Sequence, residues 1–318
     1  MRKFFIPVII LLMLACTQGV RAQHDAQFSQ YFMAMGYYNP AYAGNTEELR
    51  FFGLHRQQWL GIDRAPKSFF VMADMPFKAG NTNHGVGAVM LTETIGLFNF
   101  THVSGQYAFK KKLFGGELSI GIQAGMANIS FQGDSVRLLT IDGFSSSMID
   151  GAIPLTQVDG MVMDLNAGVY YSHPKFYAGL GVTHLAEPEL QFDENASYYI
   201  GRAFNFTAGY NIKTRNPLYE LQPSVFLKTD MISFQADLTG RVIYNKMFNG
   251  GVSWRVNESV VFLLGAQFGR FQFGYAYDFP YSPLLKRTSG SHELMIRFSM
   301  KLKKTQTGNN RHKSVRIL

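Results

Sequence analysis

The sequence has a single cysteine, Cys16, and this residue lies within the first 22 residues. These residues read as a secretory signal peptide, with a basic start, an apolar run over residues 4–15 that is too short to span a bilayer, and an acceptable cleavage site ending at Ala22. Cleavage there would leave a mature chain without a thiol, which excludes disulfides, cysteine–metal sites and a cysteine nucleophile. The alternative, lipidation at Cys16, ranks lower because the residues before it fit a lipoprotein signal poorly.

The chain also lacks a second long hydrophobic run. After residue 15 no stretch approaches about 18 consecutive apolar residues, so the sequence offers no transmembrane helix. Hydrophobic residues nevertheless make up 47% and aromatic residues 14%, with 31 glycines, whereas charged residues make up only 16%. In soluble domains about a quarter of all residues are charged. An exported chain that is apolar, aromatic, glycine-rich and poor in charge is typical of a transmembrane β-barrel in the outer membrane.

A basic surface for nucleic acid is absent as well, although the formal net charge is +8. The signal peptide contributes three basic residues and residues 301–318 contribute six, in both cases without acids, so the rest of the chain has a net charge of −1. We therefore expect no nucleic-acid partner. The basic C-terminal tail 303–318 has no periodicity, and we interpret it either as disordered or as a contact for periplasmic partners or anionic lipid headgroups.

Alternation with a period of two runs through most of the mature chain. Residues 117–127 place Ile120 and Ile122 on one face and Ser119 and Gln123 on the other. Residues 293–302 place Arg297 opposite an apolar face, where it avoids the roughly 2–4 kcal/mol that it would cost against lipid. The pattern predicts an all-β fold, a transmembrane antiparallel β-barrel of about 14 strands within residues 45–302. The predicted strands lie near 49–56, 67–75, 84–93, 98–109, 116–127, 161–172, 175–184, 202–213, 219–228, 232–244, 246–255, 259–268, 270–279 and 291–302.

The lengths of the connections predict the topology. The long connections all follow odd-numbered strands, whereas those after even-numbered strands are short; the long ones are 57–66, 128–160, 185–201 and 280–290. Outer-membrane barrels have long outside loops and short periplasmic turns. We therefore expect both termini in the periplasm. A soluble β-sandwich would also alternate, but it would not combine so many strands with so little charge.

Motifs for catalysis or metal binding are missing too. The eight histidines show no zinc spacing, and neither a nucleophile elbow nor a phosphate loop occurs. A serine–histidine pair, His292 with Ser291 or Ser299, is more simply a coincidence of common strand residues. The loop 128–160 carries four aspartates without calcium-loop spacing, which favours a solvated acidic loop. We expect no enzyme activity, no catalytic residue, no cofactor and no metal site.

Two stretches at strand ends contain residue types that often anchor interfaces. The candidate partner-binding residues are Arg56, Gln57 and Trp59 at the outer end of the first strand, and Tyr275, Tyr277 and Asp278 in the thirteenth. Each set has a second interpretation. The first is equally a folded loop with an interfacial tryptophan, and the second is an aromatic girdle with a lumen-facing acid.

The stretch 27–44 is rich in aromatic residues before its Asn-Pro turn, has no strict period of two, and reads as a packed N-terminal plug segment over residues 23–44. This stretch resembles the N-terminal signature of the PorP/SprF family, outer-membrane proteins of the type IX secretion system. The resemblance continues, in the family's order, at residues 56–62, 65–68, 221–224, 274–279 and 289–294. The basic tail departs from the family pattern, in which the chain ends soon after the last strand.

The resemblance implies a non-enzymatic integral protein of the outer membrane that is needed for secretion or surface attachment of cargo. Its implied partners are a secreted cargo protein with a C-terminal sorting domain, such as a large adhesin, other secretion components in the periplasm, and outer-membrane lipid. A link to gliding motility is implied as well. The alternative from a different class is a transport barrel for a small or apolar solute, since about fourteen strands can enclose a channel or a plug.

Overall fold

The computed structural model describes residues 25–135, 156–193, 196–281 and 286–302. The predicted signal peptide 1–22 and the basic tail 303–318 lie outside these residues, as does most of the predicted acidic loop. The predicted division of the chain at residues 22, 44 and 302 stays a prediction. In the described ranges, each helix is too short or too polar to cross a membrane.

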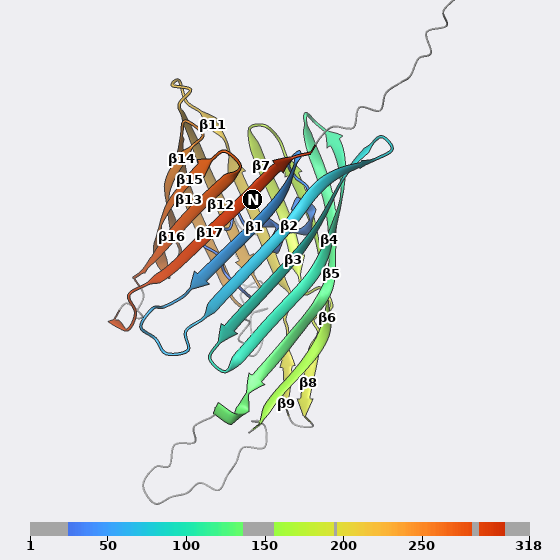
Figure 1. Cartoon of the computed structure of the whole chain (residues 1–318), viewed down its shortest axis with the longest axis vertical. Helices are drawn as coiled ribbons and strands as arrows, with labels where there is room; N and C mark the ends of the chain where they lie inside the picture. Colours follow the sequence, from blue (N-terminus) through green and yellow to red (C-terminus); the bar gives the residue numbers. More distant parts are fainter. Residues whose placement is uncertain (1–24, 136–155, 194–195, 282–285, 303–318) are drawn as a thin grey trace, which may run out of the picture.

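The described chain forms a closed antiparallel barrel of 14 strands (Figure 1). The barrel closes where β1 pairs with β17 and where β10 pairs with β12. The two-residue strand β11 (Ile212–Lys213) continues β10 along β12. The barrel strands are β1 (Glu48–Gln57), β2 (Lys67–Ala79), β3 (Thr82–Ile95), β4 (Phe98–Leu113), β5 (Gly116–Gln132), β6 (Gln157–Ser172), β7 (Phe176–Thr183), β10 (Ala203–Tyr210), β12 (Tyr219–Thr229), β13 (Phe234–Tyr244), β14 (Phe248–Arg255), β15 (Ser259–Phe268), β16 (Phe271–Pro280) and β17 (Ser291–Lys301). All fourteen predicted strands are confirmed.

The alternation of each strand separates a lipid-facing wall from the lumen. On β5, Ile120 is 53% exposed and Ile122 62%, whereas Ser119 and Gln123 beside them are buried. On β17, Leu294 points outward and Glu293 is fully buried. Arg297 faces inward, where it donates a hydrogen bond to Gln272. The predicted orientation of these strands is therefore confirmed.

Two connections contain more structure than the sequence predicts. Strand β5 continues to Gln132, because its inward face becomes apolar at Ala127 and Ile129 while its outward face becomes polar. The connection predicted as a loop over 185–201 contains a hairpin of β8 (Glu189–Asp193) and β9 (Ala196–Tyr199). Leu190 of this hairpin packs against Ile129, which explains why the alternation of β5 changes there.

Residues 25–44 lie inside the barrel and form about half of its core, and we call them the plug segment. It contains a four-residue helix, α2 (Met35–Tyr38), and a 3-10 turn, η1 (Pro40–Tyr42). Phe28, Tyr31 and Tyr38 are fully buried, and the ring of Tyr31 stacks on Phe226 of β12 at 5.1 Å. The long connections gather at the lower end of the barrel in Figure 1 and the short turns at the upper end.

Candidate functional site

A chain of buried charges joins five of six consecutive strands inside the lumen, from β1 through β17 to β13, with β15 contributing none. We call it the lumen network; it consists of Arg56 of β1, Asp237 of β13, Arg255 of β14, Asp278 of β16 and Glu293 of β17, together with Ser29 of the plug segment. Each strand residue faces inward by the alternation of its strand, and each is at most 3% exposed. Charged side chains are almost never buried so completely unless they are paired.

The two arginines bridge the three carboxylates of the lumen network. Arg56 lies 2.7 Å from Asp278 and 3.2 Å from Glu293. Arg255 lies 2.8 Å from the same Asp278 and 3.2 Å from Asp237. Asp278 is therefore shared between two guanidinium groups, so that positive and negative charges alternate along the wall. Such pairs fix the geometry more than they add stability, because each ion loses its hydration.

Ser29 connects this network to the plug segment. Its hydroxyl donates to Asp278 at 2.7 Å and accepts from Arg56 at 2.8 Å and Arg255 at 3.1 Å. These three bonds use the full capacity of one hydroxyl group. The backbone N–H groups of Ser29 and Gln30 each donate to Glu293, both at 2.8 Å. The first turn of the plug segment is thus held by bonds to charged acceptors, which are about twice as strong as neutral ones.

A second ion pair holds the end of the plug segment. Arg50 binds both carboxylate oxygens of Asp74, at 3.0 and 2.6 Å, and also donates to the hydroxyl of Tyr42 at 3.0 Å. The backbone N–H of Gly44 donates to Asp74 at 2.7 Å. Opposite this point a Cβ atom on Gly85 would lie 1.9 Å from the carbonyl oxygen of Ala43, so only glycine admits the segment there.

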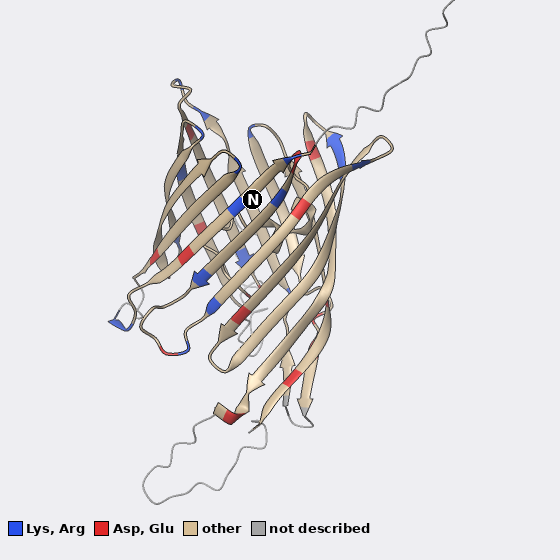
Figure 2. Cartoon of the chain, in the orientation of Figure 1, with Lys and Arg blue, Asp and Glu red and all other residues tan. Residues whose placement is uncertain are grey.

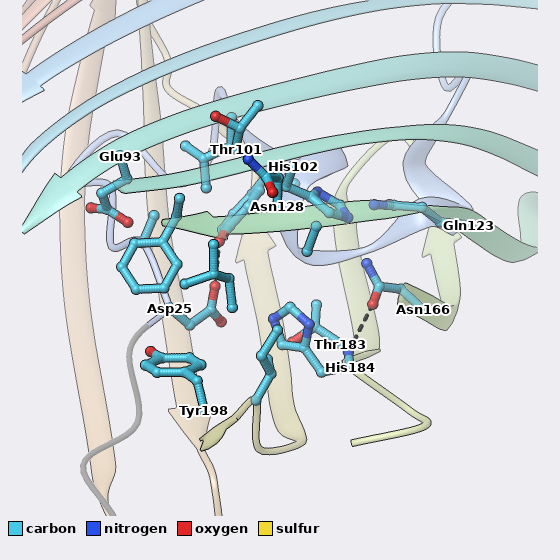
Figure 3. A pocket seen from close by; sticks show the side chains of 17 residues that line it. Asp25, Glu93, Thr101, His102, Gln123, Asn128, Asn166, Thr183, His184 and Tyr198 are labelled. Atoms are coloured by element: carbon cyan, nitrogen blue, oxygen red, sulfur yellow. Dashed lines mark hydrogen bonds between the residues drawn. The ribbon is translucent and has the colours of Figure 1, made fainter. Parts of the chain in front are cut away.

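A cavity of about 60 Å³ lies beside the start of the plug segment (Figure 3). His184, Tyr198 and Ile200 of the connection after β7 line it, so it lies toward the end of the barrel with the long connections. Asp25 forms an ion pair with Lys228 at 2.9 Å along one side. Two of the lining residues, His184 and His102, lie 3.0 Å and 3.2 Å from Asp164, which is not itself part of the lining. The remaining lining residues are Ala26, Tyr37, Leu91, Glu93, Phe100, Thr101, Gln123, Ala127, Asn128, Ile129, Asn166 and Thr183.

Two titratable groups at this cavity, both outside the membrane-spanning strands, have pKa values shifted from their ordinary values. Burial opposes the charge of His184, but the neighbouring Asp164 outweighs it and raises the pKa of His184 above its ordinary value. Burial also opposes the charge of Asp25, but Lys228 outweighs it and lowers the pKa of Asp25. A cavity of this volume has space for a few waters and for nothing much larger. Within the described ranges, no group of three His, Cys, Asp or Glu side chains is arranged to hold a metal ion.

The six predicted partner-binding residues do not form one surface. Arg56 and Asp278 belong to the buried lumen network. Tyr275 and Tyr277 alternate with buried residues of β16 and face outward, where Tyr275 bonds to His292 at 2.7 Å and Tyr277 donates to the carbonyl of Ser289 at 2.8 Å. Partly buried Gln57 ends β1. Partly buried Trp59 lies in the next loop, where its backbone N–H donates to the hydroxyl of Ser291 at 3.1 Å. Their role in partner binding stays a prediction.

Sequence reasoning missed four members of the lumen network as site residues: Ser29, Asp237, Arg255 and Glu293. A usable signal existed, since the predicted strands place three of them on lumen-facing positions of a chain with few charges. The strand register then puts Arg56 opposite Glu293 and Asp237 opposite Arg255. Charges of opposite sign at opposed positions indicate a cross-strand pair.

Three comparisons relate the chain to known proteins. A family described as "Type IX secretion system membrane protein PorP/SprF" matches residues 20–298. A search of curated protein sequences finds no match. Among solved structures, the toluene transporter TbuX of Ralstonia pickettii is 12% identical with a TM-score of 0.50, over 90% of this chain and 97% of that one. The CymD monoaromatic hydrocarbon channel is 12% identical with a TM-score of 0.48, over 91% of this chain and 96% of that one. A FadL homologue of Pseudomonas aeruginosa is 10% identical with a TM-score of 0.41, over 80% of this chain and 89% of that one. At these identities the similarity shows the barrel fold alone.

Proposed function

The chain belongs to the PorP/SprF family of type IX secretion system membrane proteins, and from this we propose that it is a docking barrel for exported cargo. The family resemblance predicted from sequence is confirmed. The chain is an integral outer-membrane component of the type IX secretion system, and family membership points to a non-enzymatic role. Our proposal concerns what the barrel binds and how.

The plug segment is the observation that carries this proposal. Its side chains fill the lumen from Asp25 to Gly44, and buried ion pairs hold it near both of its ends. Moving it aside would separate Ser29 from three charged partners, and leaving buried charged groups without their bonds costs several kcal/mol. A lumen filled in this way supports docking at the barrel's end over conduction through its centre.

The end with the long connections is the proposed docking face. It carries the hairpin β8–β9 and the loops after β1, β5 and β16. In outer-membrane barrels the longer loops face the outside of the cell, which would place this end where exported cargo arrives. We propose that it binds the C-terminal sorting domain of a secreted protein, such as a large adhesin. The opposite end would then meet other secretion components in the periplasm.

The first test is a pull-down of the tagged protein from gently solubilised outer membranes, with mass spectrometry of the partners. We expect a large exported protein with a C-terminal sorting domain, or periplasmic secretion components. A matched preparation in which the β8–β9 connection is shortened should lose the exported protein but keep the periplasmic ones. Recovery of the barrel alone in both preparations would contradict the docking role.

The alternative function is transport of a small or apolar solute. The observation that supports it is the shared barrel fold of the toluene transporter TbuX. A transporter should conduct ions in a planar bilayer or bind solute when purified, whereas a docking barrel with a seated plug segment should show little conductance. A role in gliding motility is part of the docking proposal and is tested by the motility of cells that lack the protein.

A further inference from the structure

The short-turn end of the barrel carries exposed basic side chains on or beside every one of its turns. In Figure 2 blue segments follow the upper edge of the barrel from turn to turn. We call this set the basic rim, and its exposed members are Lys78, Lys111, Lys112, Lys175, Lys213, Arg215, Lys246 and Arg270. The terminal basic tail lies outside the described residues and contributes nothing to this count. Acids also occur at this end, among them the exposed Glu47 and the partly buried Glu117, but exposed basic residues outnumber exposed acids, and such an excess indicates a partner of negative charge.

Three of these lysines gather at two neighbouring turns. Lys111 and Lys112 end β4, and Lys175 lies in the turn between β6 and β7, which is next to it because β5 pairs with both β4 and β6. Within the part of the chain that the structure describes, none of the three forms an ion pair. The nearest acid, Glu117, is already used by Asn83 at 2.9 Å and by the buried Lys110 at 3.8 Å. Apart from Lys112, which the strand register places opposite Glu117, the charges have no acidic neighbour within ion-pair distance among the described residues and are available to a partner from outside the chain.

A groove of about 670 Å³ lies between these two turns, and Lys112, Phe114, Glu117 and His173 are among its lining residues, whereas Lys111 and Lys175 lie beside it. The turn is well ordered, since the hydroxyl of Tyr171 donates to the carbonyls of Leu113 at 3.1 Å and Phe114 at 3.0 Å. Phe114 has a φ of 49° and its side chain is 87% exposed. Asn or Gly suits the first position of such a two-residue turn far better. An exposed phenylalanine there indicates that the ring contacts something other than water.

The direction of Lys111 favours lipid over a protein partner. It shares the outward face of β4 with Phe109 and Leu113, which are 39% and 37% exposed, while Lys110 on the other face is buried. A lysine on the lipid-facing wall keeps its charge in the headgroup layer by extending along the apolar surface. Phe176 nearby is also exposed, so an aromatic band lies directly beneath the basic residues. Aromatic girdles mark the membrane interface of barrels.

From these observations we propose that the groove between the β4–β5 and β6–β7 turns binds the phosphate headgroup of an anionic phospholipid. Lys112 reaches the phosphate from the lining of the groove, Lys111 reaches it from the lipid-facing side of β4 and Lys175 from the neighbouring turn, and Phe114 lies against the glycerol and upper acyl region. The remaining basic rim extends the same interaction around the barrel with one or two basic residues at each turn. This site is independent of the docking proposal, because it lies at the opposite end of the barrel from the long connections.

Native mass spectrometry of the purified full-length protein tests the proposal, using micelles with equal amounts of phosphatidylglycerol and phosphatidylcholine. The wild type should retain phosphatidylglycerol at least about tenfold over phosphatidylcholine, since one basic residue near an anionic surface contributes about fivefold. The triple variant Lys111→Gln, Lys112→Gln, Lys175→Gln should lose this preference. The double variant Lys286→Gln, Arg287→Gln at the other end should keep it.

A second variant separates the binding site from the fold. Phe114→Asn suits the turn and should leave the barrel as resistant to heat and detergent as the wild type, yet shorten lipid retention severalfold. Equal retention of both lipids by the wild type would overturn the proposal, as would an unchanged preference in the triple variant. If the triple variant keeps phosphatidylglycerol but loses an acidic protein that co-purifies with the wild type, the groove is a protein-docking surface and the lipid assignment is wrong.

Discussion

Replacing Glu293 by glutamine should release the plug segment from the barrel wall. Glu293 accepts the backbone N–H groups of both Ser29 and Gln30 and lies 3.2 Å from Arg56. A glutamine has one carbonyl oxygen, so one of the two N–H groups would face an amide NH₂ instead. Hydrogen bonds to charged groups contribute about 1.5–3 kcal/mol and an unsatisfied buried donor costs about 1–3 kcal/mol, so we expect a loss of about 2–4 kcal/mol in seating the plug segment.

That loss should be visible as exposure of a buried plug position. Each 1.4 kcal/mol is a factor of about ten, so the released population should rise by roughly 30-fold to 700-fold. Ala34 is fully buried in the plug segment, and Ala34→Cys adds one sulfur atom there. If the signal peptide is cleaved after Ala22, this introduced cysteine is the only thiol of the mature chain. Its rate of reaction with a charged maleimide then reports the released population.

A matched variant controls for the loss of a carboxylate. Glu189 of β8 is exposed and lies far from the lumen network in the sequence, so Glu189→Gln should leave the labelling rate of the introduced cysteine unchanged. Heat-modifiable migration in gels should show an intact barrel in both variants. Equal labelling rates in Glu293→Gln and Glu189→Gln would refute the idea that charged bonds hold the plug segment in place.

Three further predictions concern the plug segment and the cavity. Gly85→Val should prevent assembly of the heat-modifiable barrel, because the added Cβ would overlap the backbone of Ala43. Gly105→Ala should be neutral, since nothing in the described part of the chain lies within 4 Å of a Cβ added there. The assembled fraction is measured as the protein that remains in membranes after a urea wash. Arg50→Ala should lower the free energy of unfolding by about 3–5 kcal/mol, because it leaves Asp74 buried without its partner. Arg202→Ala should lower it by at most about 1 kcal/mol, because the pair that it breaks is exposed. Unfolding in denaturant compares the two variants. Because the pKa of His184 is raised, its contact with Asp164 stabilises the fold fully below the ordinary histidine pKa of about 6.5, and this stabilisation is lost as pH rises through the raised pKa. The difference in melting temperature between the wild type and His184→Gln should therefore shrink between pH 6 and pH 9. A difference that stays constant with pH would contradict the ion pair with Asp164.

The barrel could be predicted in detail because lipid and lumen each select side chains directly. An outward position on a strand must be apolar across the membrane, so the period of two records the strand and its orientation at once. Arg297 is an example, since this one charged residue identifies the lumen-facing positions of β17 from the sequence alone. Where a strand leaves the membrane this constraint disappears, and the extension of β5 past Ala127 and the β8–β9 hairpin were accordingly missed.

The candidate site could be predicted only in part, because its contacts join residues far apart in the sequence. Arg56 and Asp278 were chosen for their residue types, and the structure places them next to each other in the lumen. Ser29 lies 264 residues before Glu293, and no periodicity relates a turn in the lumen to a strand at the other end of the chain. The opposed pairs of the wall were accessible from register, whereas the position of the plug segment requires three-dimensional packing.

The composition of the lumen network argues that it determines position more than stability. Replacing a buried ion pair by apolar residues of similar size is often neutral or stabilising, so an apolar lumen would hold a plug segment at least as firmly. An apolar contact, however, tolerates sliding and rotation, whereas one serine hydroxyl with three charged partners is satisfied in a single arrangement. The start of the plug segment lies beside the cavity at the long-connection end, so fixing Ser29 also fixes the floor of the proposed docking face. A docking barrel needs that floor to keep one shape while its loops engage cargo, which gives buried charges a reason to persist in a chain that otherwise has few.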